Sequence, residues 1–122
     1  MKKILIIEDE KNIVTSLKMF LEYSGFEVFT SNDGSDGLYQ AKHKYPDLIL
    51  LDLVLPKIDG FNVCNLLNND EKTKNIPIIV ISARTSKEDM DKVISLGAKN
   101  YIIKPFSMDQ IIKMIKEYLG EP

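Results

Sequence analysis

LILLDLVLPKIDG, residues 48–60, is the stretch that decides the fold. Its first four residues are consecutive aliphatics, which predicts a strand buried on both faces, because a half-exposed strand would alternate apolar and polar side chains. Asp52 follows at once, and an unpaired carboxylate in an apolar setting costs several kcal/mol or takes up a proton. Asp52 therefore either reaches water at the end of the strand or belongs to a functional site.

Length and composition point to a single domain over residues 1–122. The chain is 44% hydrophobic, with 16 Lys and Arg against 18 Asp and Glu, for a net charge of −2. This balance argues against a surface for nucleic acid or for an anionic membrane. A single cysteine, Cys64, excludes an internal disulfide and suits a reducing compartment. The first apolar run ends at Glu8, too early for a signal peptide or a membrane span, so we expect a cytoplasmic protein.

Apolar runs alternate with amphipathic helical patterns along the whole chain. Strands are expected at residues 4–7, 27–30, 48–52, 78–81 and 101–103, and helices at 11–24, around 37–41, and at 61–69, 86–97 and 107–119. Strict alternation with apolar strands predicts an α/β fold, with a parallel sheet covered on both faces. The expected architecture is a flavodoxin-like, doubly wound, five-stranded sheet in the order 2-1-3-4-5 with five helices.

Polar residues stand where the expected strands end. The pair Glu8-Asp9 follows the first strand, and Asp52, Ser82 and Lys104 follow the third, fourth and fifth. A solvated rim would also be polar, so each residue alone is weak evidence. In this fold, however, ligands bind beyond the carboxyl ends of the strands, so together these residues predict one pocket with three carboxylates, a hydroxyl and an ammonium.

Charge indicates what such a pocket binds. Three ionised carboxylates repel one another, and Lys104 alone does not balance them, whereas a divalent cation would complete the neutralisation. Oxygen ligands at an open rim favour Mg²⁺, with Mn²⁺ as a substitute. A hydrated Mg²⁺ exchanges water for phosphate oxygens, which points to phosphoryl transfer with Asp52 as the nucleophile.

Over essentially its full length, the chain resembles a chemotaxis-like receiver domain of two-component response regulators. The residues that carry the resemblance are Glu8-Asp9, Asp52, Pro56, Asp59-Gly60, Ser82-Ala83, Tyr101 and Lys104-Pro105, in that order. The resemblance implies that Asp52 accepts the phosphoryl group, and that the domain is not an enzyme but catalyses only its own aspartyl phosphorylation and dephosphorylation. It also implies that Mg²⁺ is held by Glu8, Asp9, Asp52 and the backbone carbonyl of Val54.

The same resemblance supplies roles for the neighbouring residues. Lys104, Ser82 and the Ala83 amide would contact the phosphoryl oxygens, and the Lys104-Pro105 peptide bond would be cis. Val54 and Arg84 would flank the phosphoryl group and help to set its lifetime.

Output and partners are likewise implied by the resemblance. Ser82 would move inward on phosphorylation and make room for Tyr101, which rearranges the face formed by the fourth helix, fifth strand and fifth helix. The donor would be a sensor histidine kinase, a phosphotransfer protein or a small phosphodonor such as acetyl phosphate. The effector is unknown, with no direct contact of this domain to nucleic acid or membrane. We expect an excised receiver of a larger regulator, or else a stand-alone relay.

One departure bears on the branch of the family. Asn100, Gln110 and Met114 stand where winged-helix transcription factors of this family would carry an acid, an acid and an arginine. The connection at residues 70–76 is also longer than that branch usually has. The pattern is closer to single-domain chemotaxis-like receivers, or to receivers fused to cyclases or kinases.

The sequence also bears on three other functions. A flavin carrier of the same winding needs a phosphate-binding loop after the first strand, where Glu8-Asp9-Glu10 would repel a phosphate. An aspartate-dependent phosphatase needs a second acid two residues after the nucleophile, where Val54 stands. A non-phosphorylated relative would usually lack one of the acids or the lysine. His43 is expected to be a surface residue and Cys64 a small core residue.

Overall fold

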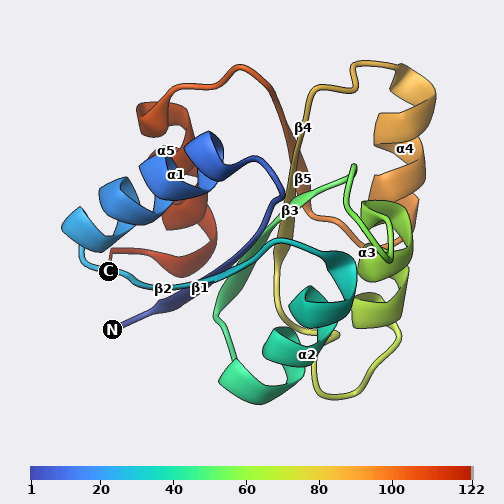
Figure 1. The fold of residues 1–122 in the computed structure, drawn as a ribbon, viewed down its shortest axis with the longest axis horizontal. Coiled ribbons are helices and arrows are strands. Elements are labelled where there is room, and N and C mark those ends of the chain that lie inside the picture. The colour runs from blue at the N-terminus through green and yellow to red at the C-terminus, as the bar shows by residue number, and fades with distance from the viewer. Residues whose placement is uncertain (122) are drawn as a thin grey trace.

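Five parallel strands form one sheet, in the order β2-β1-β3-β4-β5, in the computed structural model, which describes residues 1–121 (Figure 1). The strands are β1 (Lys3–Ile7), β2 (Glu27–Ser31), β3 (Leu48–Asp52), β4 (Ile78–Ser82) and β5 (Asn100–Ile103). The helices are α1 (Lys11–Tyr23), α2 (Gly34–Lys44), α3 (Gly60–Asn68), α4 (Lys87–Ser95) and α5 (Met108–Leu119). This confirms the predicted flavodoxin-like fold.

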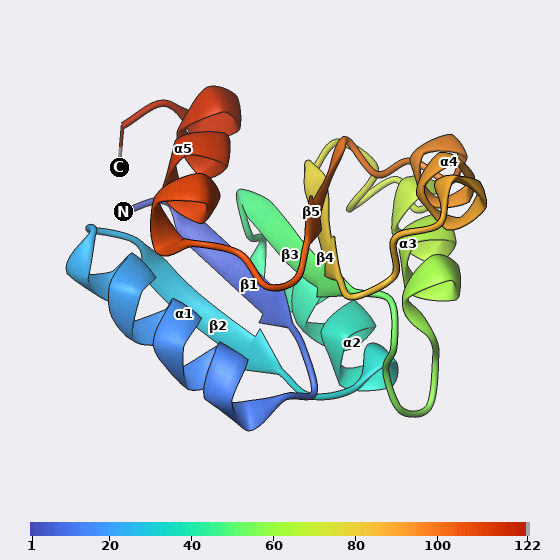
Figure 2. The ribbon, with the colours of Figure 1, turned by 90° about the horizontal axis from the view of Figure 1, so that it is seen from above.

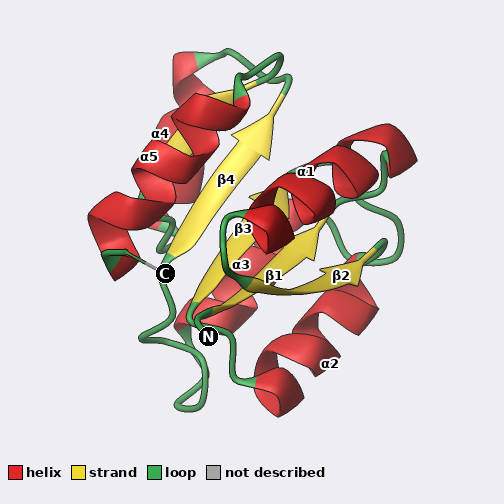
Figure 3. Cartoon of the chain, turned by 90° about the vertical axis from the view of Figure 1, so that its left-hand side faces the viewer, coloured by secondary structure: helices red, strands yellow, loops and turns green. Residues whose placement is uncertain are grey.

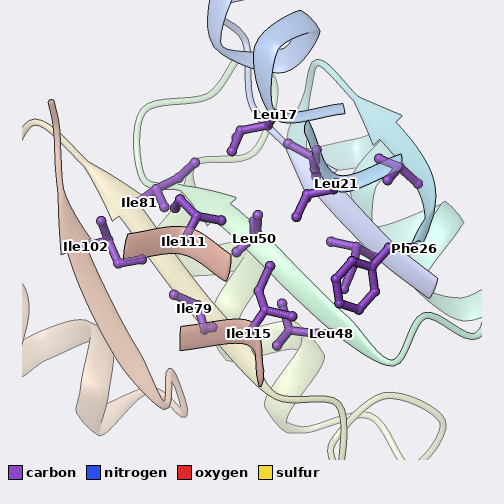
Figure 4. Packing of buried hydrophobic residues seen from close by; sticks show 13 residues of the cluster. Leu17, Leu21, Phe26, Leu48, Leu50, Ile79, Ile81, Ile102, Ile111 and Ile115 are labelled. Carbon is purple, nitrogen blue, oxygen red and sulfur yellow. The ribbon is translucent and has the colours of Figure 1, made fainter. Parts of the chain in front are cut away.

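The helices lie on both faces of the sheet (Figures 2 and 3). Alternate side chains of each strand point to opposite faces, so Ile4 and Ile6 of β1 join one core cluster, and Leu5 and Ile7 join the other. The first cluster is completed by α1 and α5, through residues such as Leu17 and Ile111 (Figure 4). The second cluster is completed by α2, α3 and α4, through Ala41, Val63, Cys64, Leu67 and Val93.

The central strand β3 explains why this stretch decides the fold. Leu48, Ile49, Leu50 and Leu51 are fully buried, two against each core cluster. Burying each such side chain contributes about 1.5–3 kcal/mol, so β3 alone couples both helical layers to the sheet. Its neighbours β1 and β4 are equally apolar, which leaves the strand ends as the place for polar chemistry.

Four of the five helices begin with a side-chain cap. Asp33, Asp59, Ser86 and Ser107 each accept a hydrogen bond from the backbone amide three residues further on, at the starts of α2, α3, α4 and α5. Such caps satisfy one of the free amides of the first helical turn. Helix α1 begins after Glu10, whose side chain makes no capping bond and is used elsewhere.

Two side chains fall where they were expected. Cys64 is buried in the second core cluster, where desolvation raises its thiol pKa to about 11, so it is a core residue. His43 is exposed on α2 and stacks on Tyr39, with 4.0 Å between the ring centroids.

Within residues 1–121, no helix has the length and apolar character needed to cross a membrane.

Candidate functional site

The register of the sheet brings the ends of β1, β3 and β5 together on one face. Ile7 pairs with Leu51, so the next residues, Glu8 and Asp52, leave adjacent strands side by side. Glu8, Asp52 and Lys104 are each two residues beyond a strand residue of the α1–α5 cluster. The period of two therefore directs all three side chains to the same face.

Lys104 lies at the centre of this group. Its Nζ is 2.8 Å from Glu8 Oε1, 3.1 Å from Glu10 Oε1 and 3.3 Å from Asp52 Oδ2. The contacts to Glu10 and Asp52 are hydrogen bonds. The contact to Glu8 is short, but its angle is not that of a hydrogen bond, so Glu8 Oε1 is a buried oxygen without a hydrogen-bond partner among the described residues.

The electrostatics of the group follow from its burial. Desolvation of the fully buried Glu8, outweighing its close contact with the Lys104 ammonium, raises the pKa of this carboxyl to about 7, and the charge of Asp52 adds to the shift. Burial by itself would lower the pKa of Lys104, but its ion pairs with Glu8 and Glu10 and the charge of Asp52 outweigh burial, so that pKa lies above its usual value. The site thus holds the charged Lys104 ammonium among several acids, and this single positive charge does not fully stabilise their ionised forms.

The acidic group fits a hard divalent cation. Glu8, Glu10 and Asp52 each offer a carboxylate oxygen, and these oxygens lie within 4.8 Å of one another. An all-oxygen, negatively charged donor set at a strand edge is what Mg²⁺ prefers, with Mn²⁺ as a plausible substitute. Within this group, Glu8 Oε1 is buried and makes no hydrogen bond among the described residues, so one carboxylate oxygen of the set is without a hydrogen-bond donor.

Asp9 is not a member of this group. The structure places it on the surface, bordering a neighbouring pocket of about 440 Å³ between the starts of α1 and α2. Glu10 joins the group instead, although no role was expected for it. The only signal in the sequence is a run of three acids after β1, which does not say which of them turns inward.

Ser82 ends β4 and is two residues beyond Val80, a strand residue of the second core cluster, whereas Ala83 borders the same groove as Lys104. Ser82 is fully buried, and its Oγ accepts a 3.2 Å bond from the Arg84 amide, while its carbonyl accepts a 2.9 Å bond from the Lys104 amide. Ala83 is exposed at the mouth of the site. The guanidinium of Arg84 pairs with Asp89 of α4 at 3.2 Å and lies 5.8 Å from the ring centre of Phe61.

Tyr101 of β5 is tied to the same segment. Its hydroxyl donates a 2.9 Å hydrogen bond to the carbonyl oxygen of Arg84, and its ring packs against the second core cluster. Ser82 and Tyr101, which lie on neighbouring strands, therefore both make a hydrogen bond to the backbone of Arg84.

The loop after β3 carries the remaining expected residues. Val54 is exposed, and its amide lies 3.4 Å from Asp52 Oδ1, a long hydrogen bond back to the strand end. The Gly60 amide donates to the Leu53 carbonyl at 2.9 Å, and a Cβ at Gly60 would overlap the carbonyl oxygen of Asp52. The Lys104-Pro105 peptide bond is cis, as expected.

Comparison with known proteins gives a consistent result. Residues 4–116 match the sequence model of the response regulator receiver domain. The chain is 42% identical over 120 residues to the alkaline phosphatase synthesis transcriptional regulatory protein PhoP of Bacillus subtilis, covering 97% of this chain and 48% of that protein. The chain thus spans about half the length of the curated relatives it matches.

Solved structures agree with the sequence match. A CheY-like response regulator receiver domain protein from Methanospirillum hungatei superposes with a TM-score of 0.92 at 28% identity, covering 98% of this chain and 94% of that one. The receiver domain of sensor histidine kinase PA1611 from Pseudomonas aeruginosa superposes with a TM-score of 0.90 at 26% identity, covering 98% of each chain. That structure is described as having a magnesium ion coordinated in its active site cleft.

Proposed function

The chain belongs to the response regulator receiver domain family, and on that basis we propose that it is a phospho-accepting signalling domain of a two-component system, with Asp52 as the acceptor. The observation that carries this proposal is the position of Asp52. Its carboxylate ends the buried strand β3, is 3.3 Å from Lys104 Nζ, and belongs to the acidic group with Glu8 and Glu10.

The proposed step is an attack of a carboxylate on phosphorus. An Asp52 oxygen forms a bond to the phosphorus of a phosphohistidine on the donor, the P–N bond breaks, and the imidazole leaves with the bonding electron pair. The product is an acyl phosphate on Asp52. Lys104 neutralises charge on the transferring oxygens, and the Ser82 hydroxyl and the Ala83 amide donate to another oxygen.

The proposed cation site uses Glu8, Asp52 and the backbone carbonyl of Val54, together with Asp9, which would have to turn toward this group from its surface position. Glu10 is an additional candidate because its carboxylate lies in the acidic group. When bound, Mg²⁺ supplies charge neutralisation to the phosphoryl oxygens. The magnesium described for the PA1611 receiver supports this choice of metal.

Val54 and Arg84 are proposed to set the lifetime of the acyl phosphate. Val54 has no group that would orient an attacking water, which favours a longer lifetime. Arg84 is held by Asp89 and is free to move only when that exposed pair opens.

The proposed output is a shift between two packings of the face formed by α4, β5 and α5. A phosphoryl group that draws Ser82 toward it changes the segment to which Tyr101 is bonded. The phosphoryl group must bind one packing more tightly than the other for this coupling to work.

The proposed donor is a sensor histidine kinase or a phosphotransfer protein, and acetyl phosphate would serve as a small donor. A groove of about 580 Å³, which is bordered by Lys104, lies between α1 and the start of α5 and offers a partner access to the site. The 42% identity to a transcriptional regulatory protein favours a regulator of gene expression, even though Asn100, Gln110 and Met114 depart from the charged pattern expected of the winged-helix branch. Residues 1–122 would form one cytoplasmic receiver domain.

The test is the intact mass of the protein after incubation with acetyl phosphate and Mg²⁺. The wild-type chain is expected to gain the mass of one phosphoryl group, and Asp52→Asn to gain none. Chelation of Mg²⁺ before the donor is added is expected to abolish the gain. A phosphoryl gain in Asp52→Asn equal to that of the wild type would refute the assignment.

A further inference from the structure

The loop that follows Asp52 rests against the N-terminus of α2. The amide of Gly34, the first residue of α2, donates a 3.2 Å hydrogen bond to the carbonyl of Pro56. A Cβ at Gly34 would overlap the carbonyl oxygen of Ile58, so the two backbones are in direct contact. Only glycine, which has no Cβ, permits the two backbones to approach this closely. The N-terminus of α2 therefore packs directly against the loop.

A charged pair joins the same two segments. Lys57 Nζ in the loop lies 3.6 Å from Asp33 Oδ2, and Asp33 also caps α2 by accepting from the Asp36 amide at 2.7 Å. Asp33 is mostly buried and Lys57 mostly exposed. The ion pair therefore joins the loop to the residue that caps α2.

The loop needs this support because its backbone is strained. Lys57 has φ 69°, in the left-handed region, and the Ile58 amide donates a 2.8 Å bond to the Pro56 carbonyl across it. A turn closed around one residue with positive φ is a rare and unfavourable γ-turn. Such strain persists only where the surrounding structure holds it, and it gathers at functional sites.

We propose that Gly34 and Asp33 are positioning residues for the Asp52–Val54 segment, and that they set the lifetime of the phosphoryl group on Asp52. This inference rests on the proposed function. Loss of the phosphoryl group requires a water oxygen to bond to phosphorus while the P–O bond to Asp52 breaks, which returns the carboxylate and releases inorganic phosphate. Val54 is exposed and its amide is bonded to Asp52, so its side chain would limit that approach. The contacts from α2 hold Pro56, Lys57 and Ile58, which follow Val54 in the same loop, and they would thereby constrain where Val54 stands.

The experiment compares Gly34→Ala with Gly37→Ala, two substitutions in the first turns of α2. The three atoms nearest to a Cβ at Gly37 all belong to the Ile7 side chain, with Cδ1 at 2.7 Å, so this control strains the packing of α2 on β1 rather than the contact between α2 and the loop. The first readout is metal-free, the ¹H–¹⁵N amide resonance of Val54. It is expected to shift in Gly34→Ala and to stay at the wild-type position in Gly37→Ala.

The second readout is the hydrolysis rate of the acyl phosphate, measured by intact mass after removal of the donor. Gly34→Ala is expected to hydrolyse at least about three-fold faster than the wild type, because a displaced Val54 exposes the phosphorus to water. Gly37→Ala is expected to match the wild type. A wild-type rate and Val54 resonance in Gly34→Ala, or equal changes in both variants, would overturn the inference.

A second pair of variants decides the question if Gly34→Ala does not fold. Lys57→Gln removes the ion pair to Asp33, and Lys99→Gln removes the same charge from an exposed lysine that forms no ion pair within residues 1–121. Lys57→Gln is expected to hydrolyse about two-fold faster than Lys99→Gln, and equal rates would overturn the inference. A wild-type chain that takes up no phosphoryl group refutes the proposed function instead, so the two failures are distinguishable.

Discussion

Lys104 Nζ lies 2.8 Å from Glu8 Oε1, and both side chains are almost sealed from solvent, at 10% and 0% exposure. Burying an ion pair costs the hydration free energy of both charges. The attraction between the charges offsets this cost only when further hydrogen bonds satisfy the remaining donors and acceptors. Glu8 Oε1 makes no hydrogen bond within the described residues, so its ionised form is poorly stabilised. The apo site therefore carries a cost that a bound cation would remove.

Substitution of Glu8 by Gln should stabilise the metal-free protein at high pH. Burial raises the Glu8 pKa from 4.5 to about 7, so Glu8 takes up a proton on folding between these values. Its contribution to stability is present below pH 4.5 and is lost as pH rises through 7. With EDTA at pH 8, Glu8→Gln should have a free energy of unfolding about 1–3 kcal/mol above that of the wild type.

Urea unfolding across this pH range measures the effect. The two proteins should converge as pH falls below 4.5, where Glu8 becomes neutral in the unfolded state as well as in the folded state. Added Mg²⁺ should stabilise the wild type more than Glu8→Gln, which lacks one proposed ligand charge. A Gln variant that is less stable than the wild type at pH 8 without metal would contradict the account.

Lys104→Met should destabilise the metal-free protein by about 2–4 kcal/mol, because it leaves Glu8 and Asp52 facing each other without a cation. Added Mg²⁺ should recover more of this loss than it adds to the wild type. Lys116→Met is the matched control, since it removes an ion pair to the exposed Glu121 and should cost less than about 1 kcal/mol. Equal losses in the two variants, measured by urea unfolding at pH 8, would argue against the buried cluster.

Cys64 should resist alkylation in the folded protein. Burial raises the thiol pKa from 9.0 to about 11, which reduces the thiolate fraction at pH 8 by about 100-fold, and the sulfur is also inaccessible. Iodoacetamide labelling followed by mass spectrometry should be complete in denaturant and at least about 100-fold slower in native buffer. Rapid labelling of the native chain would place Cys64 outside the core.

Tyr101 should change its environment when the site binds a phosphoryl mimic. Beryllofluoride with Mg²⁺ should shift the aromatic resonances of Tyr101, whose hydroxyl bonds to the Arg84 carbonyl, while the distant Tyr39 on α2 serves as an internal control. The shift should be absent in Asp52→Asn. Unchanged Tyr101 resonances in the wild type at saturating beryllofluoride would break the proposed link between the site and the output face.

The fold could be predicted from the sequence because the apolar runs, the helical patterns and their alternation all indicated the same α/β architecture. Apolar runs such as 48–51 and 78–81 read as fully buried strands, and their alternation with helices leaves few topologies. It also predicted which residues stand at the strand ends, since the sheet register puts Glu8 beside Asp52 and the period of two brings Lys104 to the same face.

Two features of the site could not be predicted from the sequence. The chain leaves the strand geometry after Glu8, so the rule of alternation no longer says whether Asp9 or Glu10 turns toward Lys104. The support of the loop by Gly34 joins backbones that are distant in sequence, and no local pattern reports such a contact. Both are decided by tertiary packing.

Reductive trapping of the phosphorylated protein tests the central claim most directly. Borohydride reduces an acyl phosphate to the alcohol, so an aspartyl phosphate becomes homoserine, and tandem mass spectrometry locates it. After treatment with acetyl phosphate and Mg²⁺, the account predicts homoserine at position 52 and at no other acidic residue. Two results would contradict the account. One is homoserine at Asp9 or Asp59 with Asp52 unmodified, and the other is a phosphoryl group that borohydride does not remove.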